Sequence, residues 1–105
     1  MSVAIHIKFK ATDRGLLSIP VASQGTYHTV WLPLAEKLGL SWVPLFENGP
    51  IVDVKELAAV MNEFRKLREA LATNSKNASI LERIDFILEE LSDVPLDEVS
   101  EIFIG

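Results

Sequence analysis

The chain has 105 residues, of which 49% are hydrophobic and 24% are charged, and its formal net charge is −5. This length and balance predict a single globular domain over residues 1–105 and exclude a disordered chain. Cysteine is absent, which excludes disulfides, thiolate metal sites and cysteine nucleophiles.

The first ten residues alternate apolar and polar side chains and carry His6, Lys8 and Lys10. A signal peptide has a basic start followed by an unbroken apolar run, and this pattern differs from it. The sequence also contains no apolar run long enough to span a membrane. We therefore expect a protein that does not bind membranes and stays in the cytoplasm.

The first 25 residues predict a β-hairpin. Residues 3–9 alternate as in a strand with one covered face. Residues 12–15 have the composition of a turn in which Gly15 takes a positive φ. Residues 17–21 alternate again, and Pro20 confines this second strand to a sheet edge.

The next segment predicts a short helix and an extended stretch. Apolar residues from Val30 to Leu38 have helical spacing, and Gly39 is a stop signal. Because Pro33 falls inside this pattern, the helix is expected to begin near Thr29 or to bend there. Residues 42–46 are apolar but include a proline, which favours a short edge strand or an extended segment.

The second half predicts two longer helices and a final strand. Apolar stripes run over 57–71 and 80–91 at three- and four-residue steps. Asp53 with Glu56 resembles a capping box for the first stripe, and Asn77 and Ser79 are candidate caps for the second. Residues 102–104 are expected to form a short strand.

Together these elements predict an α+β fold in the order β-β-α-β-α-α-β. The alternation in the first strand requires one open sheet face, and the helical stripes require an apolar surface to cover. The expected architecture is a two-layer sandwich, in which a small, mainly antiparallel sheet carries three helices on one face.

Motifs for catalysis or cofactor binding are missing from the sequence. The only histidines, His6 and His28, lack the spacing of a zinc site. The five glycines stand far apart, so no phosphate-binding loop can be fitted. We predict no metal, no cofactor and no catalytic residues, and an enzyme is the class of function least favoured.

Aromatic residues gather around the first predicted helix, together with one histidine. They are candidates for a ligand pocket or an interface, because tryptophan and tyrosine are enriched at binding hot spots. The alternative is that they fill the core between this helix and the sheet. The set comprises Tyr27, His28, Trp31, Trp42 and Phe46.

Acidic residues dominate the end of the chain. From Ile84 onward there are seven acids and no base. Glu89 and Asp93 lie four residues apart on one helix face, where like charges repel, and near a helix C-terminus, whose dipole disfavours anions. This pattern indicates a surface that steers a basic partner, or else a solvated face that only keeps the protein soluble. The candidate residues are Glu89, Glu90, Asp93, Asp97, Glu98 and Glu101.

The function favoured by the sequence is a non-catalytic protein-binding module, such as a small inhibitor or immunity-type protein that uses its acidic end against a basic partner. The alternative is a small-molecule-binding domain that uses the aromatic set. Nucleic acid is not an expected partner, because binding it needs a basic footprint. The sequence is also compatible with a homodimer.

Overall fold

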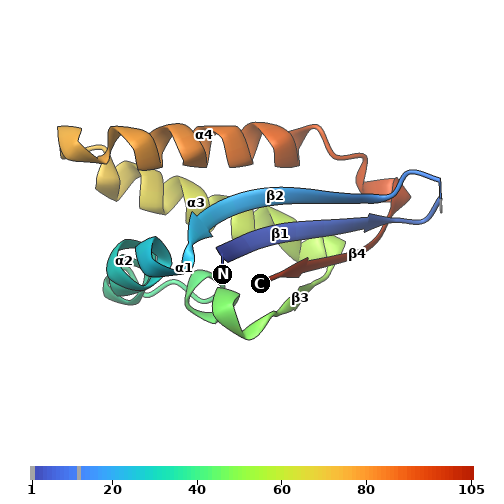
Figure 1. The fold of residues 1–105 in the computed structure, drawn as a ribbon, viewed down its shortest axis with the longest axis horizontal. Helices are drawn as coiled ribbons and strands as arrows, with labels where there is room; N and C mark the ends of the chain where they lie inside the picture. The colour runs from blue at the N-terminus through green and yellow to red at the C-terminus, as the bar shows by residue number, and fades with distance from the viewer. Residues whose placement is uncertain (1, 12) are drawn as a thin grey trace.

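The computed structural model describes residues 2–11 and 13–105. A four-stranded sheet is accompanied by a broken first helix and two longer helices (Figure 1). The strands and α-helices are β1 (Ser2–Phe9), β2 (Leu16–Ser23), α1 (Gln24–Thr26), α2 (Leu32–Lys37), β3 (Ile51–Val52), α3 (Leu57–Leu71), α4 (Ala78–Ser92) and β4 (Val99–Ile104).

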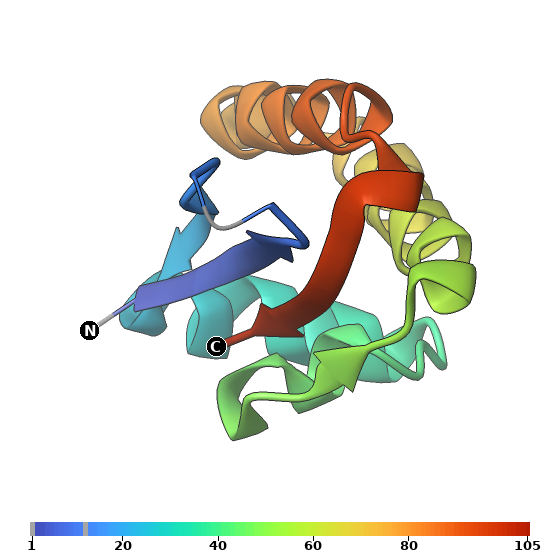
Figure 2. The same ribbon diagram turned by 90° about the vertical axis from the view of Figure 1, so that its right-hand side faces the viewer.

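The strands form one antiparallel sheet in the order β2-β1-β4-β3. Helices α3 and α4 lie side by side on one side of this sheet (Figures 1 and 2). The predicted α+β class, the order of elements and the antiparallel sheet are confirmed. As expected from Pro20, β2 is an edge strand.

Alternation along β1 separates the two faces of the sheet. Val3, Ile5, Ile7 and Phe9 are buried and belong to one hydrophobic cluster with the apolar stripes of α3 and α4. The side chains between them point to the other face, away from the side on which α3 and α4 lie. At the end of the hairpin Gly15 takes the predicted positive φ, at +72°. Thr12, which was also assigned to this turn, lies outside the described residues.

The first helix begins at Gln24 and continues through Thr29, so of the two predicted alternatives, a start near Thr29 or a bend there, the start is wrong. Ser23 caps it, accepting a hydrogen bond from the backbone N–H of Thr26. The helix passes through a π-helical turn, η1 (Tyr27–Trp31), in which the N–H of Leu32 bonds the carbonyl of Tyr27. This wider turn ends two residues before Pro33. It suits that position because a proline lacks an N–H and clashes with the carbonyl four residues before it in a regular helix.

The segment predicted as a strand over 42–46 is instead a 3-10 helix, η2 (Val43–Asn48). Pro44 occupies its first turn, where a missing N–H costs nothing. Gly49 ends the helix with φ of +67°, and the short edge strand β3 follows at Ile51. A proline beside apolar residues suits an edge strand and a helix start equally well, which explains the error.

Helix α3 follows a 3-10 turn, η3 (Val54–Glu56), whose backbone is capped by Asp53 as predicted. The turn before α4 is capped by Asn74, which accepts a bond from the N–H of Lys76. The predicted caps Asn77 and Ser79 do not serve in this way, because Asn77 caps α4 without a side-chain bond and instead donates to the carbonyl of Leu71.

Arg68 of α3 and Asp85 of α4 join the two long helices by two hydrogen bonds of 2.6 and 3.1 Å. The bond from Arg68 lowers the pKa of the Asp85 carboxyl below its usual 3.8. A carboxyl with a depressed folded-state pKa adds stability above the unfolded pKa and loses it as the pH falls through the folded pKa.

We therefore expect Asp85→Asn to lower the urea midpoint of unfolding at neutral pH, and the deficit to shrink as the pH falls below about 4. Urea titrations of both proteins across this range measure the difference. A deficit that stays constant with pH would show that the variant acts by disturbing the packing of the helices.

Candidate protein-binding surfaces

Four of the predicted acidic residues lie at the end of α4 and just beyond it. Glu89 and Glu90 are in its last turn, Asp93 follows as the C-cap, and Asp97 is in the 3-10 turn η5 (Leu96–Glu98). The last turn of α4 holds no base. Within the described part of the chain, none of the four forms an ion pair. We call these four residues the acidic end.

The structure separates the other two predicted acids from this group. Glu98 forms an ion pair with Arg14 of the β1–β2 turn. Glu101 of β4 lies opposite Lys8 of β1 in the sheet register. Its neighbour Ile102 is buried toward the helices, so Glu101 projects on the opposite face of the sheet from α4. Both acids therefore have a base next to them.

Three members of the aromatic set form part of the core. Tyr27, Trp31 and Phe46 are at most 2% exposed, and the rings of Trp31 and Phe46 lie 5.9 and 5.8 Å from that of Phe64. The hydroxyl of Tyr27 donates to the carbonyl of Val43, and burial, with a smaller effect of the Glu47 charge, raises the pKa of this phenol. These side chains offer little surface to a ligand or partner.

The remaining two members of the set lie nearer the surface. His28 is exposed, and its Nε2 is 2.8 Å from a carboxylate oxygen of Glu47 in η2. Trp42 is half-buried at the start of η2. The pair of His28 and Glu47 connects the first helix to η2, and this contact was not predicted from the sequence.

Glu63 is a second residue whose role was not predicted from the sequence. It is 8% exposed in the middle of α3. Its carboxylate accepts hydrogen bonds of 3.0 to 3.2 Å from the backbone N–H groups of Ser41, Trp42 and Val43. It thereby caps η2, whose first N–H groups have no partner within the helix. The signal was present, because Glu63 lies three residues after Val60 on the apolar stripe.

The side of the sheet that α3 and α4 leave uncovered has few charged residues. The register of the sheet places the side chains on this side in three rows, and we call these nine residues the open face. The first row is Leu16, Lys8 and Glu101, the middle row is Ser18, His6, Phe103 and Ile51, and the third row is Pro20 and Ala4. Leu16 is 56% exposed and Ile51 is 68% exposed. The open face is thus apolar except at Lys8, Glu101 and the polar pair of His6 and Ser18.

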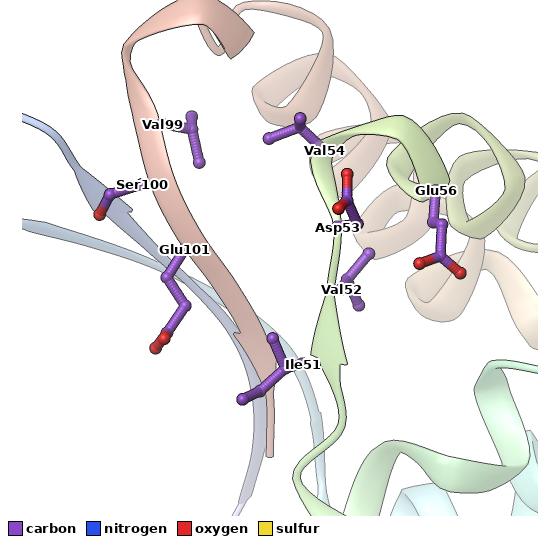
Figure 3. Close-up of a pocket in the computed structure, with 8 residues that line it drawn as sticks. All are labelled: Ile51, Val52, Asp53, Val54, Glu56, Val99, Ser100 and Glu101. Atoms are coloured by element: carbon purple, nitrogen blue, oxygen red, sulfur yellow. The ribbon is translucent and has the colours of Figure 1, made fainter.

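A groove of about 340 Å³ lies at the edge of the sheet where β3 ends and β4 continues (Figure 3). Val54 and Val99 face each other across it, whereas the carboxylate of Glu101 points away from Asp53 and Glu56. In the described residues no three His, Asp or Glu side chains gather so that they could hold a metal ion.

Comparison with protein-family models, with curated proteins and with solved structures finds no match for this chain. None of the helices that the structure describes is both long and apolar enough to cross a membrane.

Proposed function

We propose that this chain is a non-catalytic protein-binding module, of the inhibitor or immunity type, that binds a basic protein through its acidic end. The observation that carries the proposal is the unpaired state of Glu89, Glu90, Asp93 and Asp97 in the described chain, at a helix end without a base. A helix C-terminus carries a partial negative charge, so acids there oppose the dipole and a base would be stabilising.

The spacing of the acids strengthens this argument. Glu89 and Asp93 lie four residues apart and both are exposed, and like charges at this spacing repel each other. Such an arrangement costs some stability in the free protein. A basic partner would relieve the repulsion on binding, and the concentrated charge would accelerate encounter with it.

The double variant Glu89→Gln with Asp93→Asn tests the role of these charges. We expect it to raise the free energy of unfolding of the isolated protein by some tenths of a kcal/mol, because both the repulsion and the unfavourable dipole interaction are removed. Its association with a basic partner, captured from the source cell with the wild-type chain as bait, should slow by roughly three- to tenfold and depend less on salt.

The matched control is Glu36→Gln with Glu69→Gln, which removes the same two charges from exposed positions on α2 and α3. The end of α2 and the end of α3 lie at the opposite end of the molecule from the end of α4 (Figure 1). Stopped-flow association rates at two ionic strengths compare the variants. If both pairs of substitutions slow binding equally, or if the captured partner is acidic, the acidic end is only a solubilising surface.

A further inference from the structure

We infer that the open face of the sheet is the interface of a homodimer in which two copies pack sheet against sheet. This inference is independent of the acidic end, because it rests on a different face of the molecule. The nine open-face side chains include one lysine, Lys8, and one acid, Glu101, and no arginine. The face is therefore formally neutral in a chain whose net charge is −5, so two copies repel each other least there.

The register makes the open face complementary to itself. In the order β2-β1-β4-β3, strands β1 and β4 are central. Consider a twofold axis that runs parallel to the strands, in front of the open face and midway between β1 and β4. It would place β1 of one copy over β4 of the other. Twofold symmetry of this closed kind is the commonest among homodimers. Because Lys8 and Glu101 are directly opposite in the register, Lys8 would then face the partner's Glu101.

The middle row provides the apolar contact of this arrangement. His6 would face the partner's Phe103, since these residues also pair across β1 and β4. Ser18 would face the partner's Ile51 in the same way, because they occupy the outer positions of the row. Ile51, at 68% exposed, is the most exposed of the large hydrophobic residues described, and the dimer would cover it.

Burial of His6 would leave its polar atoms satisfied. Its Nδ1 lies 3.0 Å from the hydroxyl oxygen of Ser18, and its Nε2 lies 3.3 Å from the carbonyl oxygen of Gly105. The ring stacks on Phe103 with 4.5 Å between centroids. A polar group that already has its hydrogen bonds within one chain does not oppose association as an unpaired group does.

The area of the sheet is sufficient for a weak dimer. Strands β1 and β2 have eight residues each, β4 has six and β3 has two. At about 4.8 Å between strands and about 3.3 Å per residue they give a face of roughly 400 Å², or about 800 Å² for the pair. This is below the standard size of specific interfaces and in the range of weak, transient ones, so we expect a dissociation constant on the order of 1–100 µM. Since α4 is on the other side of the sheet, the acidic end of each copy would stay accessible.

Lys8→Glu tests the pairing, with molecular mass measured by sedimentation equilibrium over a range of concentrations. It would place Glu101 opposite a like charge in the partner, and we expect the dissociation constant to rise at least tenfold. Adding Glu101→Lys to the same chain exchanges the two charges, keeps the native net charge and should restore the dimer. The matched control is Lys76→Glu, which makes the same charge change at an exposed position before α4 and should leave dimerisation unaltered.

Ile51→Ser provides a second variant, because replacing a 68% exposed side chain disturbs the folded monomer little and removes apolar contact from the dimer. It should also weaken association at least tenfold. A wild-type protein that is monomeric at about 0.5 mM would overturn the inference. So would equal effects of Lys8→Glu and Lys76→Glu, failure of the charge exchange to restore the dimer, or an Ile51→Ser protein that dimerises as the wild type does.

Discussion

Replacing Phe64 with alanine is expected to lower the free energy of unfolding by about 3–5 kcal/mol, the usual cost of deleting a fully buried phenyl ring. Phe64 of α3 is 0% exposed, and its side chain packs against the first helix and η2. Its ring meets Trp31 edge-on, at 81°, and Phe46 at 41°. The truncation would leave a cavity bordered by two rigid aromatic rings, which cannot easily collapse into it.

Chemical denaturation of the purified variant, followed by circular dichroism, measures this loss. Lys66→Ala on the exposed side of the same helix is the control and should change stability by no more than about half a kcal/mol. If the two substitutions cost the same, the helical phase that places Phe64 in the core is wrong.

The helices α3 and α4 could be predicted from the sequence because their stripes are long and regular. Val60, Phe64 and Leu67 follow at steps of three and four residues, a pattern that fits only one side of a helix. The bounds of the first helix could not be predicted in the same way, because Pro33 interrupts its helical pattern. A π turn next to a proline leaves no periodic signal in the sequence. The start of the first helix at Gln24 is instead set by the cap at Ser23, a residue whose surroundings also fit a loop.

The candidate surfaces were predictable to different degrees. Glu89, Glu90, Asp93 and Asp97 were identified because a run of acids without bases is visible in the sequence itself. The open face could not be identified in the same way. Alternation in β1 indicates that one face is free, but the neighbours of His6 and Lys8 are set by pairing with residues more than 90 positions away in β4. No local pattern encodes that register.

Glu63→Ala is expected to destabilise the protein by about 2–4 kcal/mol, although glutamate is a residue type that usually lies at the surface. Its carboxylate accepts bonds from three successive backbone N–H groups, those of Ser41, Trp42 and Val43. Hydrogen bonds to charged groups contribute more than neutral ones, and a buried donor left without a partner carries a desolvation cost. The total is limited because water can reach Ser41, which is exposed.

The loss should also be local. Glu63 joins α3 to the start of η2, so its removal would loosen the segment that carries Val43 and Phe46 into the core. We expect hydrogen exchange to accelerate at the amides of Trp42 and Val43 more than at amides in β1. Exchange measured by NMR, together with urea unfolding, tests both parts of this prediction.

Two further variants determine whether the carboxylate itself is responsible. Glu63→Gln keeps the length of the side chain but replaces one acceptor oxygen by an NH₂ donor that faces N–H groups, so it should lose roughly half or more of the same stability. Glu69→Ala, at an exposed position on the same helix, should stay within about half a kcal/mol of the wild type. A Glu63→Gln protein as stable as the wild type, or a Glu63→Ala loss no larger than that of Glu69→Ala, would mean that this carboxylate does not hold η2 on α3.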